Sequence, residues 1–330
     1  MKILITGGAG FLGQQLVRAL LDRARVRLDG VEHAFDRIVC FDQVEGAISD
    51  PRVANVAGNI ADPSALAALV DRDTRLVVHL AAVVSGTAEA DFDLGMRVNL
   101  DGTRHLLEAC RAAGSQPRVL YSSSIAVFGG TLPAVVTDAT TPTPQGSYGT
   151  QKLIGELLVQ DFTRKGFVDG RSVRVPTVVV RPGRPNGAAS GFASGIIREP
   201  LAGVDAVLPV DPSTEMWIAS PRAVVRMFLH AADLPASDWG WHRTLNLPGL
   251  VATMHDELAA LRKVGGEAAL AHVHHAPDPR VIALVSTWAG RFDTSRARAM
   301  GFTADADFES IVRAYVEDNR AAVRVPLARG

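Results

Sequence analysis

The chain has 330 residues, of which 47% are hydrophobic, and its 34 basic and 35 acidic side chains leave a formal net charge of -1. This length supports one large or two modest domains with a sizeable core, and the even charge balance argues against a protein that binds nucleic acid or another polyanion. The two cysteines, Cys40 and Cys110, lie inside apolar segments. They predict buried thiols in a reducing compartment rather than a disulfide or metal framework.

The start of the chain and its hydropathy predict a soluble, cytoplasmic protein. Residues 1–5 run directly into a glycine turn, where a secretory signal would continue as a long apolar stretch. No segment approaches the ~20 uninterrupted apolar residues that are needed to cross a bilayer.

Short apolar runs alternate with helical patterns along the first half of the chain. Apolar runs at 3–6, 38–41, 76–80, 118–122 and 172–180 predict buried strands, and the segments at 12–23, 63–71, 99–113 and 148–165 have the periodicity of helices. This alternation is typical of an α/β protein with a parallel sheet. Right-handed crossovers favour a doubly wound sheet, the Rossmann fold, in which ligands bind outside the carboxyl ends of the strands.

Beyond residue 180 the pattern loosens into segments that contain proline and glycine, before helices resume at Pro221 and Thr253. We predict a smaller C-terminal substrate-binding lobe made from residues 181–220 and 249–330. The apolar run 244–247 has the character of a strand that returns to the main sheet. The first domain is therefore predicted to be 1–180 with a returning segment around 221–248.

The run Thr-Gly-Gly-Ala-Gly-Phe-Leu-Gly at 6–13 joins the first predicted strand to the first predicted helix. Glycines permit a tight turn and the close approach of a pyrophosphate, and the free N–H groups at the start of the helix bind that anion. Its position directly after an N-terminal strand favours this role over that of an ordinary strand–turn–helix connection. Residues 1–180 are therefore predicted to bind a dinucleotide.

Asp42 follows the second predicted strand, where its carboxylate can accept hydrogen bonds from the adenosine ribose and repel a 2′-phosphate. This position favours NAD over NADP. Asp42 lies farther from the glycine turn than is usual because residues 25–35 have the character of an insertion, so an ordinary loop aspartate stays an alternative. Asn59 and Ile60 follow the next apolar stretch, and we predict that they border the adenine.

Tyr148 and Lys152 lie one helical turn apart in the predicted helix 148–165. A phenol with a pKa near ~10 is a poor base at neutral pH, but a lysine ammonium beside the ring favours the phenolate. Tyr148 then becomes a usable proton acceptor. With the serine triplet at 122–124 and the glycine turn, this pair indicates an enzyme that interconverts alcohols and carbonyls with a nicotinamide cofactor.

Five motifs, taken in order, resemble those of the extended short-chain dehydrogenases/reductases, the family that also contains nucleotide-sugar epimerases and dehydratases. They are the glycine turn 6–13, the run His79-Leu80-Ala81-Ala82, Asn99, the segment 121–129 and the pair Tyr148/Lys152. The similarity covers essentially the whole chain. It implies a Rossmann fold, NAD as cofactor and a conserved proton-transfer site.

The resemblance assigns a role to each matching residue. Ser124 is the hydroxyl that hydrogen-bonds the reacting oxygen, Tyr148 is the proton acceptor, and Lys152 stabilises the phenolate and binds the nicotinamide ribose. Each has a structural alternative, since serines can cap a strand, Asn99 can cap a helix and Tyr148 can be a packed aromatic. The residues expected to bind the cofactor are Gly7, Gly10, Phe11, Leu12, Asp42, Asn59, Ile60, Leu80, Ala81, Ala82, Asn99, Ser122, Tyr148, Lys152, Pro176 and Val178.

The substrate is expected to be a small sugar acid. Where many extended members of the family carry an Asn-x-Tyr-Gly-Pro-like segment, this chain has Pro176-Thr177-Val178, which weakens the case for a nucleotide sugar. The stretches 181–201, 216–222 and 246–250 resemble instead the bacterial NAD-dependent sugar-acid dehydrogenases that act on D-erythronate. This resemblance implies oxidation of the C2 hydroxyl of D-erythronate to 2-oxo-tetronate, with Tyr148 as proton acceptor.

A small carboxylate substrate needs a cationic partner, and the predicted lobe offers Arg181, Arg184 and Arg222 for a bidentate pair. The sequence leaves open which of them binds it. Ser85 is a further candidate for contact with substrate hydroxyls. The predicted substrate-binding set is Ser85, Ser124, Tyr148, Arg181, Arg184 and Trp217.

Two other functions stay open on the sequence alone: a nucleotide-sugar epimerase or dehydratase that retains NAD, and a non-catalytic nucleotide-sensing protein. His272 and His274 can share one face of a strand as metal ligands, but no carboxylate or cysteine has suitable local spacing, so we expect no metal. We expect a small-molecule substrate and neither nucleic acid nor membrane as a partner. The helices 99–113 and 148–165 offer a homodimer interface, as in related enzymes.

Overall fold

The structure is a computed structural model that describes residues 1–183 and 189–328. The chain forms two compact units. The first comprises Met1–Val127, Pro144–Val175 and Val225–Leu247, and the second comprises Phe128–Thr143, Pro176–Val224 and Pro248–Gly330. The second unit thus includes the segment 128–143, which the sequence-based division leaves with the first domain.

A parallel sheet of seven strands in the order β12-β8-β7-β6-β1-β4-β5 forms the centre of the first unit. This sheet confirms the predicted doubly wound α/β fold, and its apolar strands are buried because helices cover both faces. The strands are β1 (Lys2–Thr6), β4 (Arg37–Asp42), β5 (Val53–Ala57), β6 (Thr74–His79), β7 (Arg118–Ser124), β8 (Asp169–Val175) and β12 (Thr244–Asn246).

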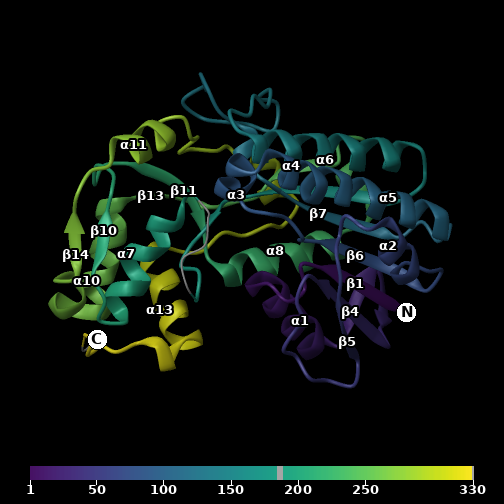
Figure 1. Cartoon of the computed structure of the whole chain (residues 1–330), viewed down its shortest axis with the longest axis horizontal. Helices are drawn as coiled ribbons and strands as arrows, with labels where there is room; N and C mark the ends of the chain where they lie inside the picture. The colour runs from purple at the N-terminus through teal and green to yellow at the C-terminus, as the bar shows by residue number, and fades with distance from the viewer. Residues whose placement is uncertain (184–188, 329–330) are drawn as a thin grey trace. The chain divides into compact units, whose positions relative to one another are not determined.

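The helices of the first unit lie on the two faces of this sheet (Figure 1). One layer contains α2 (Pro63–Leu69), α5 (Gly102–Ala113) and α6 (Ser147–Arg164), and the other contains α1 (Phe11–Arg23) and α8 (Pro221–Asp233), whose first turn belongs to the second unit. The core between α2, α5 and the sheet includes Leu66, Leu106 and Leu107, all buried. The remaining helices are α3 (Ser85–Ala90), α4 (Phe92–Gly95), the π-helix η1 (Met96–Asp101), the 3-10 helix η2 (Ile125–Val127) and α9 (Ala236–Trp239).

The predicted insertion 25–35 is an antiparallel hairpin of β2 (Arg25–Leu28) and β3 (Val31–Ala34). It separates α1 from β4 and so explains the long spacing between the glycine turn and Asp42. Its base is held by Asp233, which accepts from the Arg27 backbone N–H at 3.0 Å and pairs with Arg23.

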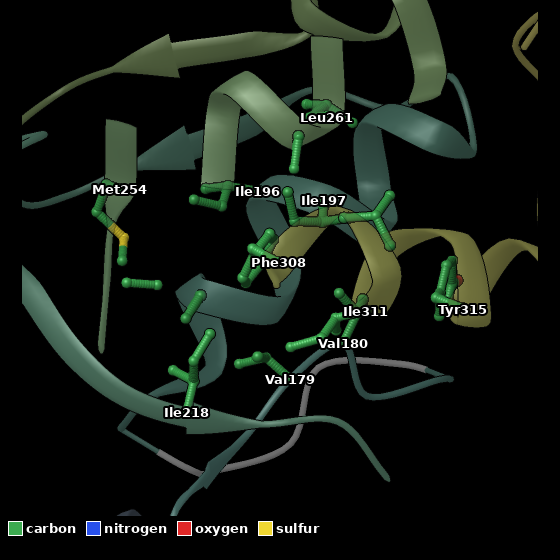
Figure 2. Packing of buried hydrophobic residues seen from close by; sticks show 14 of the residues in the cluster. Val179, Val180, Ile196, Ile197, Ile218, Met254, Leu261, Phe308, Ile311 and Tyr315 are labelled. Carbon is green, nitrogen blue, oxygen red and sulfur yellow. The ribbon is translucent and has the colours of Figure 1, made fainter. Parts of the chain in front are cut away.

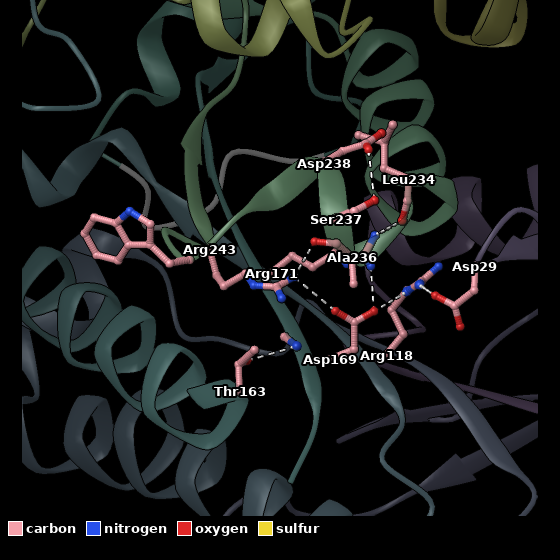
Figure 3. A network of polar contacts seen from close by, with 12 residues as sticks. Asp29, Arg118, Thr163, Asp169, Arg171, Leu234, Ala236, Ser237, Asp238 and Arg243 are labelled. Carbon is pink, nitrogen blue, oxygen red and sulfur yellow. Dashed lines mark hydrogen bonds and ion pairs between the residues drawn. The ribbon is translucent and has the colours of Figure 1, made fainter. Parts of the chain in front are cut away.

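A network of charged residues ties the amino ends of β7 and β8 to the segment that follows α8. Figure 3 shows Arg118, Arg171 and Arg243 arranged around Asp169. The Nε of Arg118 lies 2.8 Å and an amino group of Arg171 lies 2.6 Å from the same carboxylate oxygen, and Arg171 also donates to the Leu234 carbonyl at 2.5 Å. Arg171 is fully buried. Asp169 therefore balances buried positive charge while the arginines bind backbone carbonyls.

The second unit contains a three-stranded sheet in the order β13-β11-β9, a parallel pair β10-β14 and several helices. Its core packs α7 against α10 and α13, with Ile196, Ile197, Leu261 and Ile311 among the residues that interdigitate (Figure 2). The elements are β9 (Thr177–Val178), α7 (Gly191–Leu201), β10 (Ala206–Leu208), β11 (Glu215–Ala219), β13 (Leu250–Thr253), α10 (Met254–Leu270), β14 (Val273–His275), α11 (Pro279–Val285), α12 (Ser295–Ala299), α13 (Phe308–Asp318) and the 3-10 helix η3 (Arg320–Ala322).

Helix starts in the second unit are fixed by local sequence. Thr253 and Asp256 form a reciprocal capping box at α10, and Asp307 and Ser310 form one at α13. Each box satisfies N–H groups that the first turn of a helix leaves without a partner. In residues 1–183 and 189–328, none of the helices combines the length and the apolar character that a membrane span requires.

Candidate active site

The polar residues singled out from the sequence lie at one edge of the seven-stranded sheet. Thr6, Asp42, His79 and Ser124 are the last residues of β1, β4, β6 and β7, and all four strands are parallel neighbours or near neighbours. The carboxyl ends of parallel strands share an edge, so loops and helix starts that follow these residues converge there.

The glycine turn between β1 and α1 is shaped for close approach of a ligand. Gly7 has a φ of +72°, and a Cβ placed on it would lie 2.8 Å from the backbone N of Ala81, so only glycine fits there. Gly10 caps α1, whose first two residues are Phe11 and Leu12, and no acidic side chain occupies that first turn. The first turn of α1 therefore adds no negative charge of its own to the N–H groups that would bind an anion.

Asp42 lies beside the glycine turn. Its carboxylate accepts from the Ala9 backbone N–H at 3.1 Å and from Gln43 N–H at 2.7 Å. This fixes the side chain next to the turn, as the ribose-binding prediction requires. Asn59 accepts from the Ala61 N–H at 3.0 Å and so stabilises its own loop, while Ile60 is buried in the core. The adenine contacts of both residues remain predictions.

Asn99 lies in the π-helix η1, a widened turn of the kind that often marks functional sites. Its side chain binds both backbone groups of Val83, accepting from N–H at 2.9 Å and donating to the carbonyl at 3.2 Å, and donates to Gln151 at 2.8 Å. Asn99 thereby fixes the segment after Leu80, Ala81 and Ala82 against α6.

His79 joins this arrangement to the glycine turn. One ring nitrogen lies 2.6 Å from the Thr6 hydroxyl and the other 2.9 Å from the Thr103 hydroxyl, which donates to the Asn99 carbonyl. Burial, followed by the positive charge of Lys152, lowers the pKa of His79 to about 3. The ring is therefore neutral, and its two hydrogen bonds connect Thr6 to Thr103.

The start of α6 approaches the end of β7 closely. A Cβ on Gly149 would lie 2.1 Å from the Ala126 carbonyl oxygen, so glycine at this position permits the contact between α6 and η2. The Ser124 hydroxyl accepts from the Ala126 N–H at 3.1 Å. Tyr148, immediately before Gly149, is thus brought to the same edge as Ser124. Glu89 of α3 accepts from the Ser147 N–H at 2.9 Å and complements the helix start.

Lys152 is 3% exposed and donates to the Ser122 carbonyl at 2.8 Å. Its ammonium nitrogen lies 4.9 Å from the centre of the Tyr121 ring and 5.7 Å from that of Tyr148. Burial lowers the pKa of Lys152 to about 8, and the carboxylate of Glu156 opposes that decrease. The lysine thus remains close to its charge transition at physiological pH, beside the predicted proton acceptor.

A buried ion pair behind Lys152 was not identified from the sequence. Arg174 of β8 binds Glu156 of α6 with both ends of its guanidinium, at 2.9 and 2.8 Å, and Ser123 donates to the same carboxylate at 2.5 Å. Two signals point to it in hindsight. Glu156 continues the four-residue spacing of Tyr148 and Lys152, and Arg174 is a charged residue in a strand that is buried from Gly170 to Val175.

The predicted substrate residues belong to both units. Ser85 is the first residue of α3 in the first unit, while Arg181 and Trp217 belong to the second unit, as do Pro176 and Val178 of the cofactor set. Trp217 is 5% exposed and stacks on Phe292 with ring centres 5.4 Å apart. The Arg181 backbone N–H donates to Ser194 at 3.1 Å. Arg184 lies outside the described residues.

Arg222 is held by two carboxylates of α13. Its guanidinium binds Asp318 at 2.8 and 2.5 Å and Glu317 at 3.0 Å. These contacts raise its pKa further above the ordinary value. This pairing weakens Arg222 as a candidate for binding a substrate carboxylate.

The histidines near the C-terminus bind a surface carboxylate. His272 lies 2.7 Å and His274 3.4 Å from Asp205, next to the pair β10-β14. In the part of the chain that the structure describes, no group of three or more histidine, cysteine or acidic side chains is arranged to hold a metal ion.

Residues 3–236 match the model of the NAD dependent epimerase/dehydratase family. The chain is 54% identical over 319 residues to D-erythronate dehydrogenase from Cupriavidus necator, covering 96% of this chain and 98% of that protein. It is 44% identical over 320 residues to D-erythronate dehydrogenase from Haemophilus influenzae, covering 96% and 99%.

Solved structures of this family share the fold over nearly the whole chain. A nucleoside-diphosphate-sugar epimerase from Agrobacterium tumefaciens superposes with a TM-score of 0.91 at 42% identity, covering 98% of this chain and 95% of that one. A GalE-like L-threonine dehydrogenase from Cupriavidus necator superposes with a TM-score of 0.83 at 26% identity, covering 96% and 99%. The family resemblance inferred from the motifs is confirmed: the chain belongs to the NAD dependent epimerase/dehydratase family.

Proposed function

We propose that the protein is an NAD-dependent dehydrogenase that oxidises the C2 hydroxyl of D-erythronate to 2-oxo-tetronate. The observation that carries the proposal is the placement of Tyr148 beside Lys152, at the sheet edge that Ser124 also occupies, in a chain 54% identical to an enzyme named for this substrate. The glycine turn and Asp42 supply the features that a dinucleotide needs at the same edge.

The residues divide the work of proton transfer. Tyr148 accepts the proton of the substrate hydroxyl, and the Lys152 ammonium stabilises the phenolate that does so. Ser124 donates a hydrogen bond to the oxygen as it becomes a carbonyl. NAD+, when bound, supplies the hydride acceptor. The balanced reaction is D-erythronate plus NAD+ to 2-oxo-tetronate, NADH and a proton.

The cofactor would be held by residues around the glycine turn and the neighbouring strand ends. Gly7, Gly10, Phe11 and Leu12 would bind the pyrophosphate, and Asp42 the adenosine ribose. Leu80, Ala81, Ala82, Asn99 and Ser122 border the same edge, and Lys152 would bind the nicotinamide ribose. The close fit of Gly7 against the Ala81 backbone supports this set, since a side chain there would fill the approach.

The substrate carboxylate is assigned to an arginine of the second unit. Arg181 and Arg184 are the proposed candidates. Arg222, which is paired with two carboxylates of α13, is set aside. Guanidinium groups bind carboxylates in a bidentate manner. Ser85 and Trp217 complete the proposed substrate set.

The deciding experiment supplies the purified protein with NAD+ and a panel of four- to six-carbon sugar acids and follows NADH, with NADP+ as a parallel control. Formation of NADH with D-erythronate above all other acids supports the proposal. Conversion of a nucleotide-diphosphate sugar without net NADH would instead identify an epimerase or dehydratase, the alternative brought forward by the Agrobacterium relative. NAD binding without any turnover would identify a sensing protein.

Location and assembly are part of the proposal. Cys40 and Cys110 are both buried and free, as suits a protein kept in the reducing cytoplasm. A homodimer through α5 and α6 is proposed from the family and is tested by light scattering of the purified protein.

A further inference from the structure

We propose that Glu156 is a positioning residue which, with Arg174 and Ser123, holds Lys152 and Ser124 in place and sets a buried negative charge one helical turn behind the lysine. This inference rests on the roles proposed above for Tyr148, Lys152 and Ser124. It assigns a task to a buried ion pair that the proton-transfer steps themselves do not use.

The helix places three functional side chains in line. Tyr148, Lys152 and Glu156 are spaced by four residues along α6, and residues four apart on a helix lie one above the other on the same face. Glu156 therefore lies one turn behind Lys152, on the side away from Tyr148. Glu156 and Arg174 are 3% and 4% exposed, so their charges act with little screening by solvent.

The ion pair of Glu156 and Arg174 also holds neighbouring backbone segments in place, and we call this structural role the brace. Ser123, which donates to Glu156, lies between Ser122, whose carbonyl accepts from Lys152, and Ser124, the proposed partner of the reacting oxygen. Arg174 extends the network to the Asn246 side chain at 3.4 Å. The end of β7 is thus clamped to α6 and, through β8, to β12.

The charges around Lys152 set the direction of the electrostatic effect. The titratable groups near it are Tyr148 and Glu156 of α6, Tyr121 of β7, neutral His79 of β6 and, on the far side of Glu156, Arg174 of β8. Glu156 is the acidic group that raises the pKa of Lys152 against the effect of burial. Removal of its charge alone leaves Arg174 buried and uncompensated near the lysine.

The test titrates Lys152 directly, without substrate or turnover. The chain contains four lysines, Lys2, Lys152, Lys165 and Lys263, so lysine labelled with carbon-13 at Cε gives four NMR signals, and Lys152→Met identifies the relevant one. In Glu156→Gln the midpoint of Lys152 should fall by about 1 pH unit, and in Arg174→Gln it should rise by about the same amount. The double variant Glu156→Gln/Arg174→Gln should return toward the wild-type midpoint.

If the Lys152 midpoint shifts in opposite directions in the two single variants, the effect is due to charge. Looser packing around Lys152 would shift the midpoint in the same direction in both variants. Unchanged midpoints, or shifts of equal sign, overturn the electrostatic role. Should Glu156→Gln fail to fold, Arg174→Gln and the double variant still decide, because a double variant that shifts by a full unit contradicts the compensation. This titration uses no substrate. If the wild type does not oxidise D-erythronate in the presence of NAD+, the proposed substrate is wrong, but the measured midpoint of Lys152 still tests the role of Glu156.

The brace is tested with Ser123→Ala, which removes the hydrogen bond but no charge. Its Lys152 midpoint should match the wild type, while kcat with D-erythronate should fall about tenfold with little change in KM, because the reacting groups lose alignment. Wild-type kcat in a folded Ser123→Ala protein would overturn the positioning role.

Discussion

The strands β7, β8 and β12 connect two networks of arginine and carboxylate, one at each end. At the amino ends, Asp169 is surrounded by three arginines that also bind backbone carbonyls. At the carboxyl ends, Glu156 and Arg174 form a one-to-one buried pair behind Lys152. The chemistry of the contacts is the same, but the second network lies next to the proposed proton-transfer residues, since Ser123 directly precedes Ser124 and Glu156 lies one helical turn from Lys152. We therefore expect the Asp169 network to stabilise the fold and the Glu156–Arg174 pair to position Lys152 and Ser124.

The largest effect is expected from Tyr148→Phe. This substitution removes only the phenol oxygen, near the carboxyl ends of the strands. Turnover of D-erythronate should fall by about 10²–10⁴-fold, since the proton acceptor is lost, while NAD binding and the free energy of unfolding remain near wild type. Steady-state NADH formation and NAD binding by calorimetry measure the two quantities. Near-normal turnover in this variant would refute the role of Tyr148.

Asp169→Asn, at the amino ends of the strands, should lower stability and leave turnover nearly unchanged. It leaves buried Arg171 and nearly buried Arg118 without their shared carboxylate, so the free energy of unfolding should fall by about 3–5 kcal/mol. The rate constant per folded molecule should change little. Urea unfolding measures the loss.

Asp318→Asn is the matched control, because it removes a carboxylate from the half-exposed Arg222. An exposed ion pair contributes about 1 kcal/mol or less. Equal losses from the two substitutions would contradict the special weight given to the buried network.

Asp42→Ala tests another carboxylate at the carboxyl ends of the strands, the one that we assign to the cofactor. The affinity for NAD should fall by roughly 10–100-fold, since a charge-assisted hydrogen bond contributes about 1.5–3 kcal/mol, and the discrimination against NADP should shrink. Binding titrations with both cofactors measure these changes. A preserved preference for NAD would remove Asp42 from the ribose site.

A modest effect is expected at Glu257 of α10, a fully buried carboxyl group whose oxygens have no hydrogen-bond partner among the described residues. Burial raises its pKa well above the ordinary 4.5. Its favourable contribution to stability is thus complete below about pH 4.5 and is lost as the pH rises through the folded-state pKa. Glu257→Gln should remove this decline and exceed wild-type stability by about 1–2 kcal/mol at pH 8.

Denaturant unfolding at pH 5 and pH 8 checks the Glu257 prediction. A wild type and a Glu257→Gln variant with the same pH dependence would show that the carboxyl group is compensated. The outcome sharpens the comparison, because Glu257, unlike Asp169 and Glu156, has no arginine partner among the residues that the structure describes.

The sequence predicted most of the first unit because its strands are short apolar runs and its helices have clear periodicity. Of the helix predicted at 99–113, the α-helical part is α5 from Gly102 to Ala113, and Asn99 lies in the preceding π-helix η1 (Met96–Asp101). The insertion 25–35 was recognised only as extra length, not as a hairpin. Its second strand, β3, is exposed at all four positions and pairs with β2, so it lacks the apolar pattern of a core strand.

The buried networks could not be read from local patterns because their partners are far apart in the chain. Ser123 is 33 residues from Glu156, and Asn246 is 72 from Arg174. Tyr148, Lys152 and Ser124 were recognisable as a family set of motifs, whereas the neutral state of His79 and the brace behind Lys152 depend on burial, which only the folded structure provides.

Gly149 offers a practical criterion for sorting related sequences. Because any Cβ at this position would collide with the Ala126 carbonyl, a relative that keeps the tyrosine and the lysine but carries a larger residue between them must hold its helix farther from the serine strand. The identity of this single small residue therefore sets how closely the start of α6 can approach η2, and with it the separation between the helix that carries Tyr148 and the strand that carries Ser124.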